Sequence, residues 1–229
     1  MTIVLHDLAG TGDRRFSPFC WRARLALCHK NLPHEARPVT YAEVRAFPDD
    51  FGKTAPVLDD NGHVVPDSSA IATYLEATYP DRPSLFGDAH ARALCKFVES
   101  WTAASLHVTL IGMVVKDIHD HVVDDDRAYF RASREERFGA TLEAMQAGRE
   151  DRLEGFRKAL TPLRLTVRQQ PFLGGDDPVY ADHIVAAAFQ WVRTISDFRV
   201  VAADDPVWDW IERMDGLYGG VLGDAPTYY

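Results

Sequence analysis

The first residues of the chain alternate between patterns typical of a strand and of a helix. Residues 2–6 form a short, mainly apolar run with the length of a strand. Apolar side chains then recur at the spacing of one helix face from Trp21 to Leu32. Residues 35–39 make a weaker strand pattern. The expected order is therefore strand, helix, strand.

A hairpin and a second helix complete this part of the chain. Asn61-Gly62, a dipeptide favoured in tight hairpin turns, separates two apolar runs at residues 56–58 and 63–65. Residues 71–78 then follow helical spacing, with Asp67 or Ser68 as the N-cap. The pattern predicts a small mixed sheet with helices packed on it.

Helical patterns dominate the rest of the chain. Residues 79–84 are a proline-punctuated linker, and no proline follows between Pro83 and Pro162, so nothing forces a helix to break there. Amphipathic patterns cover residues 97–115, 126–147, 153–168 and 182–195. We therefore expect two domains, residues 1–80 of mixed α/β structure and residues 86–229 that are all-helical.

Charge and composition narrow the function classes. The chain has 34 acidic and 25 basic residues, a net charge of −9, so it lacks the basic footprint of proteins that bind phosphate backbones. No window approaches the roughly 18 consecutive apolar residues of a membrane span, and the best run, residues 106–115, is interrupted by His107 and Thr109. We expect neither a nucleic-acid partner nor a membrane partner.

The cysteines and the first residues indicate a compartment. Three cysteines, an odd number without metal-type pairing, suit a reducing environment. The first seven residues have no basic segment and no cleavage signature of a secretory signal. A cytoplasmic location is expected.

The sharpest local feature is Ser17-Pro18, between the first strand and the first helix. Proline is favoured one step inside a helix start, which makes Ser17 the N-cap. Free N–H groups and the positive end of the helix dipole would stabilise a thiolate brought there. Ser17 and Cys20 occupy the ends of a C-x-x-C motif whose first cysteine is replaced, which argues against dithiol exchange. An ordinary serine cap is an equally good local interpretation.

Two further segments are candidate binding elements. Pro56 opens a predicted strand, and if its peptide bond is cis, Ala55 turns its N–H and C=O outward, ready to pair with an extended peptide. Asp67 and Ser68 start the next helix, where a hydroxyl and free N–H groups suit a carboxylate and the Asp67 side chain suits an ammonium. Plain helix capping would also explain Asp67 and Ser68.

The order and spacing of these motifs resemble the glutathione S-transferase family, over nearly the whole chain. The resemblance is carried by Ser17-Pro18 with Trp21, by Lys53-Thr54-Ala55-Pro56-Val57-Leu58, by Asp67-Ser68-Ser69-Ala70-Ile71-Ala72 with Tyr74-Leu75, and by Phe172-Leu173-Gly174-Gly175-Asp176 followed by Ala181-Asp182-His183-Ile184. It implies a thioredoxin-like N-terminal domain and an all-helical C-terminal domain. Within the family the chain resembles the serine-type, bacterial β-etherase-like members.

The resemblance also implies an activity. Ser17 would hydrogen-bond the sulfur of glutathione, a co-substrate, and favour its thiolate, which would attack a small hydrophobic, aromatic electrophile, with an aryl ether as one candidate. Residues 8–16 and 101–115, rich in apolar and aromatic groups, would build the electrophile site. No metal is required. The family also implies a homodimer.

The remaining contacts to glutathione follow by the same resemblance. Ala55, beside an expected cis-Pro56, would pair with the cysteinyl backbone. Asp67 and Ser68 would hold the amino and carboxylate groups of the γ-glutamyl end, and Lys53 would face the glycyl carboxylate. The family commonly has Glu or Gln in place of Asp67.

One departure from the family concerns a folding element. Val179 stands where the family usually has a Ser or Thr that caps the helix carrying Asp182, so one leg of a capping box is expected to be missing.

Two other functions use the same residues. A glutathione-binding protein without transferase activity would keep the binding series, and a thiol oxidoreductase would use Cys20, although Cys20 should be less exposed than Ser17. Residues 119–121 and 124–126 contain His and Asp side chains that could bind a divalent metal, but a solvated loop between helices is the better interpretation.

Overall fold

The computed structural model describes residues 2–229, and a four-stranded mixed sheet forms its N-terminal part. The strands are β1 (Ile3–Leu8), β2 (Glu35–Val39), β3 (Val57–Asp60) and β4 (His63–Pro66). Their order is β2-β1-β3-β4, in which only the β1–β2 pair is parallel. Asn61 and Gly62 turn between β3 and β4 with φ of 53° and 91°, the positive φ that tight hairpins require.

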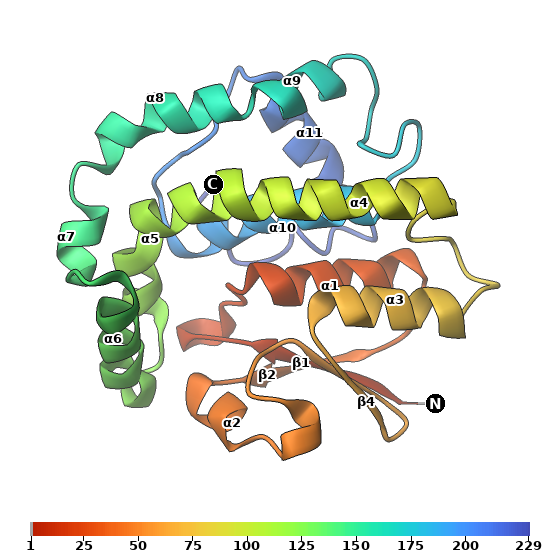
Figure 1. Cartoon of the computed structure of the whole chain (residues 1–229), viewed down its shortest axis with the longest axis horizontal. Coiled ribbons are helices and arrows are strands. Elements are labelled where there is room, and N and C mark those ends of the chain that lie inside the picture. The colour runs from red at the N-terminus through yellow and green to blue at the C-terminus, as the bar shows by residue number, and fades with distance from the viewer. Residues whose placement is uncertain (1) are drawn as a thin grey trace.

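Three helices pack on this sheet. They are α1 (Pro18–His29), α2 (Tyr41–Ala46) and α3 (Ser68–Thr78). Helices α1 and α3 cover one face and α2 lies on the other (Figure 1). The sequence pattern missed α2, which has only six residues. The sequence feature that could have predicted it is a capping box, Thr40 followed by Glu43. In the structure the Glu43 N–H donates to Thr40 Oγ1 and the Thr40 N–H donates to Glu43 Oε2.

The second part of the chain is helical. Its elements are α4 (Ala89–Trp101), a π-helical turn η3 (Thr102–His107), α5 (Val108–His121), α6 (Asp124–Phe138), α7 (Leu142–Gln146), α8 (Arg149–Ala159), α9 (Thr161–Val167), α10 (Tyr180–Ile195) and α11 (Pro206–Asp215). A mixed sheet followed by this helical part confirms the predicted fold class, a thioredoxin-like N-terminal domain followed by an all-helical domain.

Several helix bounds differ from the sequence pattern. The run expected over 126–147 is broken at Gly139, which ends α6 in the left-handed conformation with φ of 68°. The run over 153–168 divides at Leu160, and the next helix begins with a proline at its second position. Helix α11 was not expected. Local turns therefore divide two stretches that apolar spacing alone had predicted as single helices.

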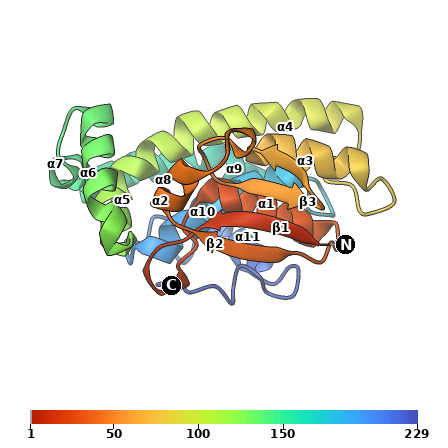
Figure 2. The ribbon, with the colours of Figure 1, turned by 90° about the horizontal axis from the view of Figure 1, so that it is seen from below.

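Helix α10 is the centre of the helical part. All of its residues are buried, as expected for a helix that has neighbours on every side. It lies between α1 of the sheet layer and the outer helices α8, α9 and α11 (Figures 1 and 2). The α1–α10 contact thus joins the sheet domain to the helical domain along a helix face.

The start of α10 is held by Asp182. Val179 has no hydroxyl to cap the helix, as expected, but the Asp182 carboxylate accepts the Val179 N–H at 3.0 Å. The same carboxylate accepts the N–H groups of Leu173 and Gly174 and the indole N–H of Trp210, at 2.7 to 3.2 Å. One buried carboxylate therefore joins the preceding loop, α10 and α11.

Helices α4 and α5 form one continuous helical segment, Ala89–His121, of 33 residues. By length and composition it could cross a membrane, although the core helix of a globular domain passes the same test. Its second half contributes Leu106, Leu110, Met113 and Val114 to the buried core. In this fold the segment is thus a structural member of the helical domain.

Candidate active site

Ser17 caps α1, as predicted. Its backbone is extended, and its Oγ accepts the N–H of Cys20 at 3.2 Å. Because that bond uses an oxygen lone pair, the hydroxyl proton is left to donate. The side chain lies at the positive end of the α1 dipole, where a negative charge is stabilised.

A cavity of about 830 Å³ opens at Ser17, between the sheet domain and the helical domain. Its floor includes Leu8, Phe16 and Ser17 from the end of β1 and the start of α1. Lys53 and Ala55 lie on the same lining. Three of the six residues predicted for the site are therefore brought to one cavity.

The peptide bond between Ala55 and Pro56 is cis. Pro56 is buried, and β3 begins one residue later. Within residues 2–229, neither the N–H nor the C=O of Ala55 has a hydrogen-bond partner in the turn and loop network. A residue on a cavity wall with unpaired N–H and C=O groups can pair with an extended peptide, as an added strand would.

Asp67 and Ser68 lie at the start of α3 and do not line the cavity. The Asp67 N–H donates to the carbonyl of Pro56 at 3.3 Å, which places the helix start beside the cis proline. Asp67 has a φ of 73°, rare for a residue with a side chain. Its Oδ1 caps the N–H groups of Ser69 and Ala70, so half of the carboxylate is already used for capping.

Unpaired buried polar atoms occur at the start of α3 and on α1. Ser68 Oγ is buried and has no hydrogen-bond partner, and the same holds for two guanidinium nitrogens of Arg22. The remaining Arg22 nitrogen pairs with Glu99 at 3.2 Å. Buried polar atoms are normally paired, so this region has donors to spare for an anion.

Lys53 projects from the loop between η2 (Asp49–Phe51) and β3. Its ammonium donates to the Phe47 carbonyl and lies 3.6 Å from Asp49 Oδ1. The side chain remains exposed, so these contacts hold it at the rim of the cavity.

Cys20 is separated from the cavity. The thiol is fully buried, and its sulfur accepts the N–H of Leu8 at 3.4 Å. Burial, reinforced by the charge of Asp7, raises the pKa of Cys20 well above its ordinary value. Cys20 is less exposed than Ser17, as expected, and its thiol is a poor nucleophile.

The helical domain supplies the opposite wall. Ala103, His107, Val108, Ile111 and Gly112 line the cavity, which agrees with the predicted contribution of residues 101–115. The His107 ring makes edge contacts with Phe19 and Trp191, at centroid distances of 5.6 and 5.7 Å. Burial lowers the pKa of His107 to about 4, so this ring is neutral at pH 7.

Helix α6 forms a third wall that sequence reasoning missed. Tyr129, Phe130, Arg134, Arg137 and Phe138 line the cavity from one side of this helix. Asp126, which is fully buried, fastens α6 to α2, because its carboxylate accepts the N–H of Ala42 and a guanidinium N–H of Arg45 at 3.1 and 3.2 Å. Few residues of α6 are buried, so its sequence gave little sign of a function.

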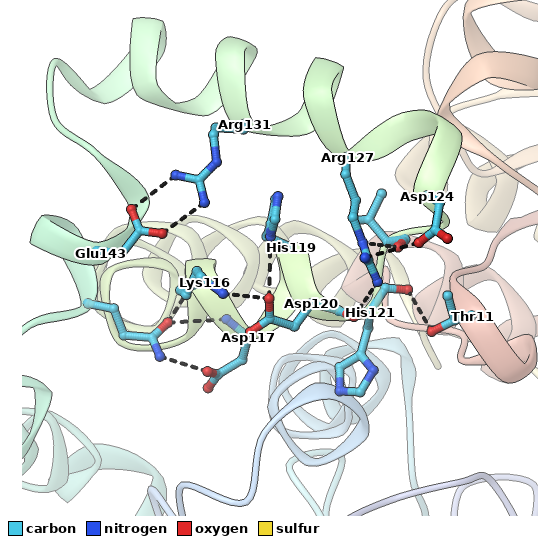
Figure 3. A network of polar contacts seen from close by, with 12 residues as sticks. Thr11, Lys116, Asp117, His119, Asp120, His121, Asp124, Arg127, Arg131 and Glu143 are labelled. Carbon is cyan, nitrogen blue, oxygen red and sulfur yellow. Dashed lines mark hydrogen bonds and ion pairs between the residues drawn. The ribbon is translucent and has the colours of Figure 1, made fainter.

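The His and Asp residues near the end of α5 form a polar network instead of a loop (Figure 3). Helix α5 continues to His121 and α6 begins at Asp124, so the expected solvated loop is wrong. Asp120 pairs with Lys116 and His119, at 2.5 and 3.3 Å. The rings of His119 and His121 point in different directions, and no group of three metal-ligating side chains occurs among the described residues.

The same network fastens the sheet domain to α5. Thr11 Oγ1 donates to the carbonyl of His121 at 3.2 Å. A Cβ on the neighbouring Gly10 would lie 2.1 Å from that carbonyl oxygen, so only glycine permits this approach. The loop that leads to Ser17 is thereby fixed against the helical domain.

Comparison with known proteins places this cavity in a family. Residues 13–83 match the glutathione S-transferase N-terminal domain, and residues 93–217 match the glutathione S-transferase C-terminal domain. The chain belongs to the glutathione S-transferase family. The two matches fall on the sheet domain and on the helical domain, whose junction holds the cavity.

Curated relatives in the family are similar over part of the chain. Glutathione S-transferase Z1 of Arabidopsis thaliana is 41% identical over 99 residues, which cover 38% of this chain and 45% of that protein. A zeta-class glutathione S-transferase of Euphorbia esula is 29% identical over 137 residues, 58% of this chain and 61% of the relative. The chain thus spans about half the length of these relatives.

Solved structures of the family are similar over nearly the whole chain. Glutathione transferase GSTFuA3 of Phanerochaete chrysosporium superposes with a TM-score of 0.78 at 26% identity, covering 97% of this chain and 94% of the other. CsGST63524 of Ceriporiopsis subvermispora, solved in complex with glutathione, has the same TM-score at 23% identity and the same coverage. At 23% identity, the similarity to CsGST63524 shows the shared fold only.

Proposed function

We propose that this protein is a glutathione transferase of the serine type. The observation that carries the proposal is the position of Ser17, which caps α1 and faces the interdomain cavity with its hydroxyl proton free to donate. A thiol with a pKa near 8.5 is only a few per cent ionised at pH 7, so a donor that stabilises its thiolate raises the reactive fraction. The sulfur then attacks the electrophilic carbon, and the leaving group departs with the electron pair of the broken bond.

The residues around Ser17 support binding of glutathione. The unpaired backbone of Ala55, beside cis-Pro56, suits the cysteinyl backbone, and Lys53 at the rim suits the glycyl carboxylate. Ser68, with its buried unpartnered hydroxyl, suits the γ-glutamyl carboxylate, and the outer oxygen of Asp67 suits the ammonium. The Ceriporiopsis subvermispora neighbour of the same fold was solved in complex with glutathione.

Burial supports Ser17 over Cys20 as the residue that activates the glutathione thiol. The Cys20 thiol is fully buried, has a raised pKa and does not line the cavity, which supports the serine-type reaction over a Cys20-based oxidoreductase. The apolar walls of the cavity support turnover of an aromatic electrophile over simple storage of glutathione. The β-etherase-like specialisation stays a prediction from the sequence resemblance, as does the cytoplasmic location.

Calorimetric titration with glutathione and a turnover assay with chlorodinitrobenzene test the proposal together. We expect the wild-type chain to bind glutathione and to release chloride as the conjugate forms. Asp67→Ala combined with Ser68→Ala should abolish binding, whereas Asp81→Ala with Ser84→Ala, in the following linker, should not. Binding without turnover of chlorodinitrobenzene, aryl ethers or glutathionyl-ketones would favour the glutathione-binding protein without activity.

A homodimer is the assembly that we propose. Leu94 and Phe97, one turn apart on α4, are 68% and 71% exposed. Large exposed apolar side chains are typical of interaction surfaces, and the family resemblance pairs the helical domain of one subunit with the sheet domain of its partner. Light scattering should give twice the chain mass, and Leu94→Glu combined with Phe97→Glu should give monomers. A monomeric wild-type chain at micromolar concentration would contradict the proposal.

A further inference from the structure

The lining of the Ser17 cavity is positively charged. Arg45, Lys53, Arg134 and Arg137 line it, and among the described lining residues there is no Asp or Glu. This departs from the chain as a whole, where acidic residues outnumber basic ones by 34 to 25. A concave site lined by side chains of one charge sign attracts ligands of the opposite sign.

Two of the four cations have a carboxylate partner within the protein. Arg45 lies 3.2 Å from Asp126 Oδ1, and Lys53 lies 3.6 Å from Asp49 Oδ1. Arg134 and Arg137 form no ion pair with any carboxylate in residues 2–229, although Arg131 on the same helix pairs with both Glu135 and Glu143. The free positive charge of the cavity is therefore on Arg134 and Arg137, which are one helical turn apart.

Aromatic side chains position the Arg134 guanidinium. Its central carbon lies 4.6 Å from the ring centroid of Phe130 and 5.4 Å from that of Tyr41. One of its N–H groups donates to Ser133 Oγ at 2.9 Å, which leaves further donors unused. A half-buried guanidinium oriented by aromatic rings is well suited to bind a carboxylate through two parallel hydrogen bonds.

We propose that Arg134 and Arg137 bind a carboxylate carried by the electrophilic substrate, so that this enzyme conjugates glutathione to aromatic acids. The inference rests on the proposed transferase function and specifies its substrate class. The apolar walls formed by Phe16, Ile111 and Trp191 would surround the aromatic ring. Ser17 on the floor and the arginines on α6 would then hold the sulfur and the carboxylate at different parts of one cavity.

Two substrates that differ in one group test the proposal. Chlorodinitrobenzoate and chlorodinitrobenzamide share the ring and the leaving group, and only the first carries a negative charge. With either substrate the glutathione sulfur bonds to the chlorine-bearing carbon, and chloride leaves with the electron pair of the C–Cl bond. We expect kcat/KM for the benzoate to exceed that for the benzamide by tenfold or more in the wild-type protein.

The variant Arg134→Gln combined with Arg137→Gln should remove this preference. Loss of a charge-assisted bidentate contact should lower kcat/KM for the benzoate ten- to hundredfold. Turnover of the benzamide and the KM for glutathione should change less than about threefold. Arg131→Gln is the matched control, since it removes a charge from the same helix but from a side chain that does not line the cavity, and it should leave the preference intact.

A binding measurement keeps the test independent of turnover. Dinitrobenzoate and dinitrobenzamide, which lack the leaving group, are titrated against the quenching of tryptophan fluorescence. Preferential binding of the benzoate that disappears in the double variant, without any turnover, would uphold the carboxylate site and overturn the transferase. Equal affinity for the two probes in the wild-type protein would overturn the carboxylate site. So would a double variant that loses glutathione affinity while it keeps the benzoate preference.

Discussion

The Cys20 N–H donates to Ser17 Oγ at 3.2 Å, so the serine that faces the cavity and the cysteine behind it are joined by one hydrogen bond. The bond fixes the hydroxyl oxygen at the first turn of α1. The two residues stand at the ends of a segment with C-x-x-C spacing, but their environments differ. Ser17 lines the cavity with a hydroxyl proton left to donate, and Cys20 packs in the core.

Replacing Ser17 with alanine should therefore impair chemistry much more than binding. Ser17→Ala removes a hydrogen bond to a charged acceptor, worth about 1.5–3 kcal/mol, and one decade in rate corresponds to about 1.4 kcal/mol. We expect turnover of chlorodinitrobenzene to fall roughly ten- to hundredfold. Ultraviolet titration of bound glutathione should show the pKa of its thiol rising toward the free value, with little change in affinity.

Cys20→Ser is the matched variant on the same helix. We expect it to retain most of the turnover and to lose stability, because a hydroxyl replaces a fully buried thiol in an apolar setting. The opposite result, with Cys20→Ser inactive and Ser17→Ala active, would make this chain a thiol oxidoreductase.

The pH dependence of stability should report on His107. In the unfolded chain this imidazole takes up a proton near pH 6.5, but burial lowers its pKa to about 4 in the folded protein. Between these values the unfolded state binds more protons at this site, so the contribution of His107 to the free energy of unfolding falls as the pH falls through this window and is constant above it. The loss attributable to His107 should be roughly 1–2 kcal/mol at pH 5.

Urea unfolding at pH 7.5 and pH 5 measures this contribution. His107→Phe, which keeps an aromatic ring against Phe19 and Trp191, should be less sensitive to acid than the wild-type protein. His90→Phe, at an exposed position on α4, should keep the wild-type slope. Equal slopes for the wild-type protein and His107→Phe would contradict the assigned shift.

Gly10 is predicted to be required for the close approach of the loop before α1 to the end of α5. Gly10→Ala would place a Cβ 2.1 Å from the carbonyl oxygen of His121 and 2.8 Å from the ring of Phe16. Because the first neighbour is backbone, we expect a destabilisation of about 1–3 kcal/mol from the forced shift. Gly155→Ala, in α8 with open space around it, should instead stabilise by about 0.5–1 kcal/mol. Thermal unfolding of both variants checks the pair.

The sequence was most informative where short-range rules act. The Asn61-Gly62 hairpin, the Ser17 cap and the strand that follows Pro56 each depend on a few neighbouring residues, and each was found where predicted. The cavity brings Ser17, Lys53 and Ala55 together because their loops meet at the same end of the sheet. That juxtaposition came from family resemblance, since periodicity cannot bring distant loops together.

Long-range contacts account for most of what the sequence did not reveal. Helix α6 is highly polar, so from the sequence its arginines look like those of a solvated helix. Only the long-range contacts of Asp126 with α2 bring this helix to the cavity. The sequence allowed two interpretations of Asp67, as a helix cap and as a ligand for an ammonium group. The structure shows that one of its oxygens caps α3. The break at Gly139 could have been predicted from the glycine, but the apolar spacing continued past it.

Asp182 is the polar group on which the helical domain should depend most. Its two oxygens accept four N–H groups, from Leu173 and Trp210 on one side and from Gly174 and Val179 on the other. Asp182→Asn would turn one oxygen into an NH₂ group that faces two N–H donors, and a buried donor left unpaired costs about 1–3 kcal/mol. We expect the free energy of unfolding to fall by about 2–4 kcal/mol in urea titrations.

The site itself should survive this substitution, since Asp182 does not line the cavity. At a temperature where Asp182→Asn remains folded, its KM for glutathione and its turnover should match the wild-type values within about twofold. Asp176→Asn, which changes an exposed carboxylate in the loop before α10, should leave stability unchanged within about 0.5 kcal/mol. An unchanged urea midpoint for Asp182→Asn would contradict the prediction. It would mean that the four hydrogen bonds of the Asp182 carboxylate are not needed to hold the start of α10.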